Sequence, residues 1–189
     1  IINLILNMQV GVIGLGKLGC SMFAAFASSG NEVFGFDVNE EIREKLKKNI
    51  QPVSETGLQK ELELGVDNYY IVDNPLKVIK NSDVIYIIVP TPSLKDGTFD
   101  TSYLENVIQE IIFVDCCCKN KLLVITSTVL PSDTRLKLIS KVRKHKGKIS
   151  DINFCYSPEF IALGSVLNDL KNPDFLLVGE DHPHSADKH

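Results

Sequence analysis

The amino-acid sequence predicts an α/β fold with a doubly wound, mainly parallel sheet and helices on both faces. Three observations lead to this prediction. Short apolar runs alternate with segments of helical periodicity along the whole chain. The runs Val84–Val89 and Leu122–Thr126 are almost wholly apolar, which is typical of strands buried on both faces. A glycine-rich turn joins the first run to the first helical pattern.

The elements follow in a regular order. The expected strands are Val10–Ile13, Glu32–Phe36, Tyr69–Val72, Val84–Val89, Leu122–Thr126, Asn153–Tyr156 and Phe175–Val178. Three helices are expected where apolar residues recur three and four apart: around Leu18, Met22 and Phe26, around Leu104, Val107, Ile108 and Ile111, and around Leu136, Ile139 and Val142. Two more are expected over Glu40–Lys48 and about Glu55–Leu64. Such βαβ units form a Rossmann-type parallel sheet with right-handed crossovers.

Composition narrows the function classes. The chain has 189 residues, a net charge of −4 and scattered Lys and Arg, so we expect no nucleic-acid partner. No stretch approaches the roughly 20 apolar residues of a membrane span, so no membrane partner is expected. We expect one domain over residues 8–180. Residues 1–7 are an N-terminal extension of uncertain status, and residues 181–189 are a polar tail or the start of a linker.

The five cysteines indicate a reducing, cytoplasmic setting. Their number is odd and no C-x-x-C spacing occurs, which argues against a disulfide framework and against a metal site. We expect Cys20, Cys116–Cys118 and Cys155 to be structural thiols.

Gly14-x-Gly16-x-x-Gly19 lies between the first strand and the first helix. In a dinucleotide site Gly14 would make the tight turn, Gly16 would let the backbone approach a pyrophosphate, and Gly19 would let the helix pack closely on the sheet. The N–H groups at the helix start, near Lys17 and Leu18, would face the pyrophosphate charge. A purely structural glycine turn is the alternative.

Asp37 ends the second strand roughly 20 residues after the first glycine, where a carboxylate can accept hydrogen bonds from the adenosine ribose. A carboxylate there would repel a 2′-phosphate, so the pattern favours NAD over NADP. The alternative is that Asp37 caps the next helix together with Asn39.

Polar and rigid residues follow the later strands. Val89 ends the fourth strand, and Thr91 and Pro92 follow it. Ser127-Thr128-Val129 follow the fifth strand, and Pro158-Glu159-Phe160 follow the sixth. Because ligands of doubly wound sheets bind beyond the carboxyl ends of the strands, we expect these residues to surround the cofactor and substrate.

With these motifs in register, the chain from about Met8 to Gly179 resembles the UDP-glucose/GDP-mannose dehydrogenase family, the nucleotide-sugar 6-dehydrogenases. The motifs include "P-x-x-E-x-G-L" at Pro52–Leu58, "V-P-T-P" with "D-G-x-x-D", and "D-L-x-x-P-D" after Glu159. The resemblance implies two successive NAD-dependent oxidations that turn the C6 alcohol of a UDP- or GDP-sugar into a carboxylate, by way of a cysteine-bound aldehyde.

The resemblance also implies roles for individual residues. Thr128 would order a water or the reacting oxygen and contact the cofactor, together with Val89, Thr91 and Pro92. Glu159 would be the general base or would order the hydrolytic water, and Phe160, Ile161 and Ala162 would bind the substrate with it. Leu163 takes the place of a second glutamate of the family, and Phe175 takes a place where arginine is frequent, which leaves a sugar other than glucose open.

The family's nucleophilic cysteine and its central helix follow the cofactor domain. The resemblance therefore implies that this chain is an N-terminal portion that binds NAD but is catalytically incomplete. It implies a homodimer for the full-length enzyme and leaves a monomer open for the portion. Two alternatives remain open: a β-hydroxyacid or 6-phosphogluconate-type dehydrogenase domain, and a catalytically silent NAD-binding module.

Overall fold

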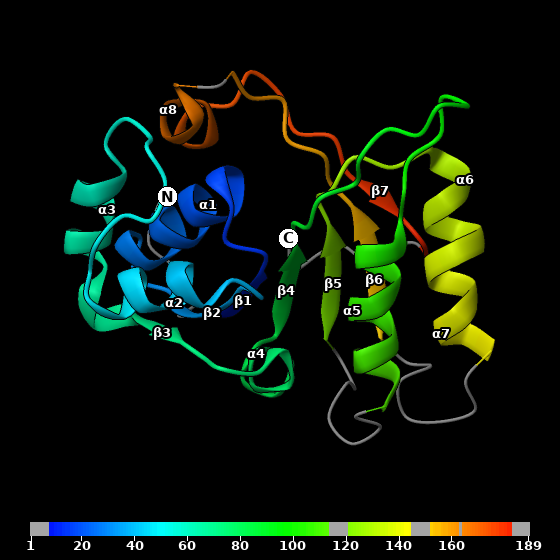
Figure 1. The fold of residues 1–189 in the computed structure, drawn as a ribbon, viewed down its shortest axis with the longest axis horizontal. Helices are drawn as coiled ribbons and strands as arrows, with labels where there is room; N and C mark the ends of the chain where they lie inside the picture. The colour runs from blue at the N-terminus through cyan, green and yellow to red at the C-terminus, as the bar shows by residue number, and fades with distance from the viewer. Residues whose placement is uncertain (1–7, 114–120, 145–151, 163, 183–189) are drawn as a thin grey trace.

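The computed structural model describes residues 8–113, 121–144, 152–162 and 164–182. Their strands are β1 (Gln9–Ile13), β2 (Glu32–Phe36), β3 (Tyr69–Ile71), β4 (Val84–Ile87), β5 (Leu122–Ile125), β6 (Asn153–Tyr156) and β7 (Gly179–Glu180). They form one sheet in the order β3-β2-β1-β4-β5-β6-β7. All neighbours are parallel except β6 and β7. The predicted doubly wound, mainly parallel fold is confirmed (Figure 1).

Helices cover both faces of the sheet. Their bounds are α1 (Lys17–Ser28), α2 (Glu40–Lys47), α3 (Leu58–Leu64), η1 (Val66–Asn68), α4 (Pro75–Asn81), α5 (Ser102–Phe113), α6 (Pro131–Asp133), the π-helical η2 (Thr134–Ile139), α7 (Ser140–Lys144) and α8 (Val166–Lys171). One hydrophobic cluster joins the sheet to α1, α2, α3 and α8, and the other joins it to α4, α5, η2 and α7.

The central strands show why the sheet needs both layers. Along β4, Val84 and Tyr86 belong to the first cluster, and Ile85 and Ile87 belong to the second. Successive side chains point to opposite faces of a strand, so a run that is apolar throughout requires a hydrophobic layer on each side.

The seventh strand was predicted in the wrong place. Phe175–Val178 is exposed and forms no strand; β7 comes directly after it and pairs with β6 through only two residues, antiparallel. The chain is still returning from α8 at Phe175, and it first reaches the edge of β6 at Gly179. Periodicity cannot distinguish a short apolar run in a sheet from one in an extended arm.

Two α-helices, α4 and α8, and the short helix η1 were missed, and several bounds of the expected helices shift. The sequence signal for α4 was Asn74-Pro75, since the Asn74 side chain accepts a hydrogen bond from Leu76 N at 2.8 Å and proline occupies the first turn. The missed α8 is only six residues long. The helix expected from about Glu55 begins at Leu58, because Gly57 precedes it with a φ of +82°.

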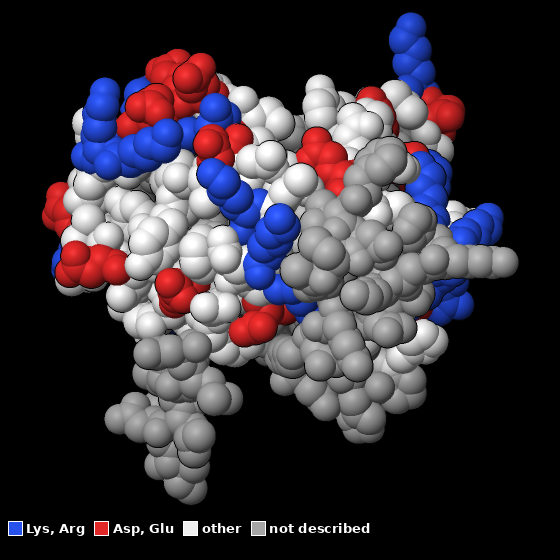
Figure 2. All heavy atoms as spheres, turned by 90° about the horizontal axis from the view of Figure 1, so that it is seen from below, with Lys and Arg blue, Asp and Glu red and all other residues white. Residues whose placement is uncertain are grey.

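The charged side chains are mixed on the surface. On the face seen in Figure 2, lysines and arginines lie among aspartates and glutamates, in agreement with their scattering along the sequence. Within the described ranges, no helix combines the length and the apolar character that a membrane crossing requires.

Candidate functional site

The loops that carry the predicted site residues leave neighbouring strands at one edge of the sheet. Backbone hydrogen bonds join them in series: Gly14 N donates to Phe36 O at 2.8 Å, and Ile88 N donates to Ile13 O at 2.8 Å. Ser157 N continues the series to Ile125 O at 3.0 Å. The strand order reverses between β1 and β4, so this edge is the topological switch point at which such sheets bind ligands.

The three glycines of the first loop differ in what surrounds them. Gly14 has a φ of +96°, and a Cβ there would lie 2.1 Å from Ile88 O. A Cβ on Gly19 would lie 1.9 Å from Gly14 O, so this glycine lets α1 pack against the loop. Around Gly16, by contrast, no heavy atom of the described residues lies within 4 Å of a Cβ position. Nothing inside the described protein requires a glycine at position 16, which fits close approach by a ligand from outside.

The start of α1 fits the pyrophosphate of NAD. Gly16 caps the helix without a side chain, and Cys20 N makes the first helical bond, to Gly16 O at 2.8 Å. The N–H groups of the first turn, including those of Lys17 and Leu18, therefore lack intrahelical acceptors and lie at the positive end of the helix dipole. Lys17 adds a half-exposed ammonium group to this end.

Asp37 lies beside the glycine loop, and its carboxylate has a structural role there. Its Oδ2 accepts a hydrogen bond from Leu15 N at 2.7 Å, and its Oδ1 accepts one from Asn39 N at 2.8 Å. Asn39, rather than Asp37, caps α2, because its side chain accepts from Glu41 N. Each carboxylate oxygen keeps a further lone pair, so the same group can also bind a ribose hydroxyl.

The ends of β4 and β5 are joined by Ser127, which the sequence placed beside the expected cofactor and substrate but to which it assigned no role. Val89 N donates to Ser127 Oγ at 2.9 Å, and Ser127 Oγ donates to Val89 O at 2.8 Å. This bond fixes the chain just before Thr91, which is half-buried, and Pro92, which is exposed. Thr128 follows Ser127 and is exposed at the same edge.

Glu159 leaves the neighbouring strand at the same level as Thr128. Ile125 and Tyr156 are paired in register, and each of the two site residues follows its strand by the same number of positions. Parallel strands lie about 4.8 Å apart, so both side chains emerge in adjacent loops. Glu159 is half-buried, and burial raises the pKa of its carboxyl.

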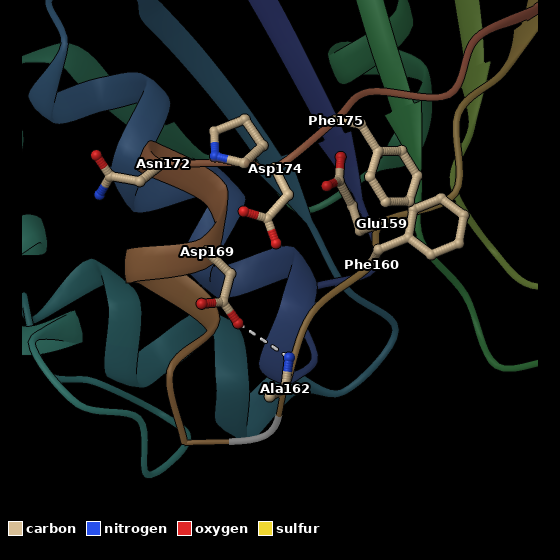
Figure 3. Close-up of a pocket in the computed structure, with 8 residues that line it drawn as sticks. Glu159, Phe160, Ala162, Asp169, Asn172, Asp174 and Phe175 are labelled. Carbon is tan, nitrogen blue, oxygen red and sulfur yellow. Dashed lines mark hydrogen bonds between the residues drawn. The ribbon is translucent and has the colours of Figure 1, made fainter.

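Glu159 also lines a pocket of about 230 Å³ between two arms of the chain, one leaving β6 and one returning from α8 (Figure 3). The predicted residues Phe160 and Ala162 line it too, and half-buried Ile161 lies between them in the chain. The Phe160 ring lies against the Phe175 ring with 4.7 Å between centroids. The full lining is Glu159, Phe160, Ala162, Asp169, Asn172, Pro173, Asp174 and Phe175.

The charge of the pocket limits what it can hold. Three of its lining residues are carboxylic acids and the others are uncharged, so it suits hydroxyl groups better than phosphates. Asp169 is engaged by the protein itself: its Oδ2 accepts from Ala162 N at 3.0 Å and from Ser165 Oγ at 2.9 Å. These bonds hold its pKa below the ordinary value and fold the arm into the turn before α8.

Replacing Glu159 by glutamine is expected to stabilise the chain more at pH 8 than at about pH 4. Burial raises the pKa of this carboxyl above its ordinary 4.5, so the folded chain binds the proton more tightly than the unfolded chain. Stability is therefore lost as the pH rises through the raised pKa, and Glu159→Gln removes that loss. Urea unfolding at both pH values measures the difference. Equal effects at both, or the same pH dependence for exposed Glu63→Gln, would contradict it.

The described cysteines are core residues. Cys20 and Cys155 are buried, and burial raises the pKa of each thiol to about 12. Thiolates are the nucleophilic form, so neither residue is suited to covalent catalysis. Cys116–Cys118 and Leu163 lie outside the described residues.

The sequence matches the model of the UDP-glucose/GDP-mannose dehydrogenase family, NAD binding domain, over residues 8–189. A GDP-mannose 6-dehydrogenase of Pseudomonas putida is 29% identical over 185 residues, which are 95% of this chain and 42% of the relative. A UDP-glucose 6-dehydrogenase of Haloferax volcanii is 27% identical over 91% of this chain and 41% of its own length. The chain thus spans less than half the length of these relatives.

Solved structures of dehydrogenases have the same fold as this chain. A ternary complex of GDP-mannose dehydrogenase from Pseudomonas aeruginosa superposes with a TM-score of 0.89 at 28% identity, over 96% of this chain and 43% of that one. A UDP-glucose dehydrogenase from Pyrobaculum islandicum superposes with a TM-score of 0.91 at 26% identity, over 100% of this chain and 44% of that one.

Proposed function

Because the chain belongs to the UDP-glucose/GDP-mannose dehydrogenase family, as its NAD binding domain, we propose that it is the N-terminal part of a nucleotide-sugar 6-dehydrogenase. The enzyme would oxidise the C6 alcohol of a UDP- or GDP-sugar to a carboxylate. The observation that carries the proposal is the position of Glu159. Its carboxyl, with a raised pKa, lines a pocket at the sheet edge that also carries the glycine loop.

The cofactor would bind at the loops that follow β1, β2, β4 and β5 at this edge of the sheet. The first turn of α1, with Gly14, Gly16, Lys17, Leu18 and Gly19, would bind the pyrophosphate, and Asp37 would accept hydrogen bonds from the adenosine ribose. The free N–H groups at the start of α1 and the place of Asp37 beside the glycine loop support this assignment. Val89, Thr91, Pro92 and Thr128 would contact the nicotinamide half of the cofactor, because they follow β4 and β5, the strands beyond β1 at the switch point. NAD, when bound, accepts a hydride from the sugar carbon in each oxidation.

Glu159 would accept the released proton, either directly or through a water molecule. Oxidation of the alcohol, and then of the thiohemiacetal, releases one proton for every hydride transferred, and a carboxylate with a raised pKa is suited to accept it directly or through a water. Thr128, on the adjacent loop, would orient the oxygen that loses the proton. Phe160, Ile161 and Ala162 would lie along the sugar nucleotide, which is supported by the place of Phe160 and Ala162 in the lining of the pocket.

The covalent intermediate needs a thiol that the described residues do not supply. Cys20 and Cys155 are buried and poor nucleophiles at neutral pH. We propose that this group comes from a part of the enzyme after the cofactor domain, and that residues 1–189 alone bind NAD with little turnover. A cytoplasmic location and a homodimer of the complete enzyme belong to the same proposal.

The test is NADH formation by the complete enzyme against a panel of UDP- and GDP-sugars, with UDP-glucose and GDP-mannose included. Glu159→Gln is expected to lower kcat by about a hundredfold or more while the KM for NAD stays unchanged. Exposed Glu110→Gln serves as the control. Absence of NADH formation with every sugar, while NAD still binds, would favour the silent NAD-binding module. Full activity of Glu159→Gln would show that Glu159 is not the general base.

A further inference from the structure

Helix α8 packs far from the strands that precede and follow it. The chain leaves β6, crosses to α8 beside α1 and α3, and returns to β7; we call residues 157–162 and 164–178 the strap (Figure 1). Buried Leu167 of α8 belongs to the same hydrophobic cluster as Phe23 of α1 and Leu58 of α3. The strap therefore spans the switch point and carries the pocket with Glu159.

Two carboxylates from the segment before and within α3 hold the two ends of α8. Glu55 Oε1 accepts a hydrogen bond from Val166 N, the first residue of α8, at 3.1 Å. Lys171 Nζ, at the last residue of α8, donates to Glu61 Oε1 at 2.5 Å. Glu61 Oε2 in turn accepts from Ser28 Oγ of α1 at 2.5 Å. The position of α8 thus depends on contacts between residues more than a hundred positions apart in the chain.

Glu55 differs from Glu61 because its side chain is wholly buried, with 0% exposure. Its second oxygen, Oε2, has no hydrogen-bond partner among the described residues and lies 3.5 Å from Lys17 Nζ. Lys17 is the first residue of α1 and directly follows Gly16. One buried carboxylate therefore lies between the cofactor loop and the start of α8.

The electrostatics make these two contacts interdependent. A buried carboxylate is costly unless its charge is compensated, and here the compensation comes from one ammonium group and one helix N–H. If Lys17 moves away, the charge on Glu55 loses its counter-ion; if α8 undocks, Glu55 loses its hydrogen bond. A pyrophosphate at the α1 N-terminus would place a second negative charge near Lys17, so the position of Lys17 would depend on both the cofactor and Glu55.

We propose that Glu55 is a positioning residue that couples NAD binding at the glycine loop to the docking of α8, and through it to the strap that carries Glu159. NAD binds the docked state more tightly than the undocked one, so NAD suppresses local opening of α8. Coupling free energies are reciprocal, so loss of the Glu55 charge weakens NAD binding as well. This inference goes beyond the proposed function: it rests on NAD binding and needs no sugar.

The test compares the chain with Glu55→Gln, which keeps the size and one acceptor for Val166 N but removes the charge opposite Lys17. Amide hydrogen exchange of residues 164–172 is measured with and without saturating NAD, and the NAD dissociation constant is measured by calorimetry. In the unaltered chain, NAD is expected to slow exchange at Val166 at least about threefold. In Glu55→Gln this slowing is lost, and the dissociation constant rises about tenfold, the size of one charge-assisted contact.

Matched variants separate coupling from general damage. Glu63→Gln, an exposed glutamate in the same helix as Glu61, is expected to keep the NAD-dependent slowing. If Glu55→Gln fails to fold, Lys17→Met removes the same Lys17–Glu55 contact by changing the half-exposed lysine instead. This variant is expected to abolish the NAD-dependent slowing of amide exchange in α8. Slowing of equal size in Glu55→Gln or Lys17→Met, or no effect of NAD on α8 in the unaltered chain, overturns the proposal. Failure of every sugar assay leaves it intact, so the two proposals fail separately.

Discussion

Gly16→Ala is expected to raise the dissociation constant for NAD by at least about tenfold and to change the free energy of unfolding by less than about 1 kcal/mol. Its backbone, at φ −68° and ψ −163°, is extended and open to alanine. No heavy atom of the described residues lies within 4 Å of the added Cβ, so the protein itself has room for the methyl group, which would instead meet a pyrophosphate bound as proposed. Calorimetry with NAD and urea unfolding measure the two quantities.

Gly19→Ala is the matched variant with the opposite pattern. Its Cβ would lie 1.9 Å from Gly14 O, so α1 must move away from the loop. We expect a loss of about 1–3 kcal/mol or more in stability, with NAD binding lost as a consequence. If Gly16→Ala binds NAD as tightly as the unaltered chain, the glycine loop is only a structural turn and the pyrophosphate does not bind there.

Asp37→Asn is expected to weaken NAD binding by about tenfold or more and to narrow the preference for NAD over NADP. The change removes the charge that repels a 2′-phosphate. It also costs stability, about 1–3 kcal/mol, because the carboxylate accepts from both Leu15 N and Asn39 N, and an asparagine can accept through only one of its two terminal atoms.

The ratio of the two dissociation constants separates these effects. Loss of loop structure weakens NAD and NADP alike and leaves the ratio unchanged, whereas loss of ribose recognition changes it. Asp67→Asn, at an exposed acid in η1, is the control. A preference for NAD that survives Asp37→Asn would mean that Asp37 only supports the glycine loop.

The predictability of the fold followed from burial on both faces. Strands such as β4 and β5 must be apolar throughout because helices cover both of their faces. A continuous apolar run is easy to recognise in the sequence. The misplaced strand at Phe175–Val178 and the missed α8 both lie in the strap, which packs through distant contacts. Local periodicity carries no information about such partners.

For the candidate site, the sequence could nominate residues but not their structural partners. The place of Glu159 and Thr128 after strands put them at the sheet edge, the family resemblance implied their roles, and the register of β5 and β6 brings them to one level. The sequence placed Ser127, Glu55 and Asp169 in motifs but assigned no role to them, because their hydrogen-bond partners become neighbours only in the folded chain.

The sequence by itself determined the doubly wound sheet, the glycine loop with Asp37 at its carboxyl edge, and the resemblance to a nucleotide-sugar dehydrogenase family. Each depends on residues close together in the chain or on motifs in a fixed order. Only the tertiary structure decided that the strap returns across the switch point and that Glu55 lies between Lys17 and α8. The physical reason is that a buried charge is stabilised by neighbours in space, and these come from segments that the sequence keeps far apart.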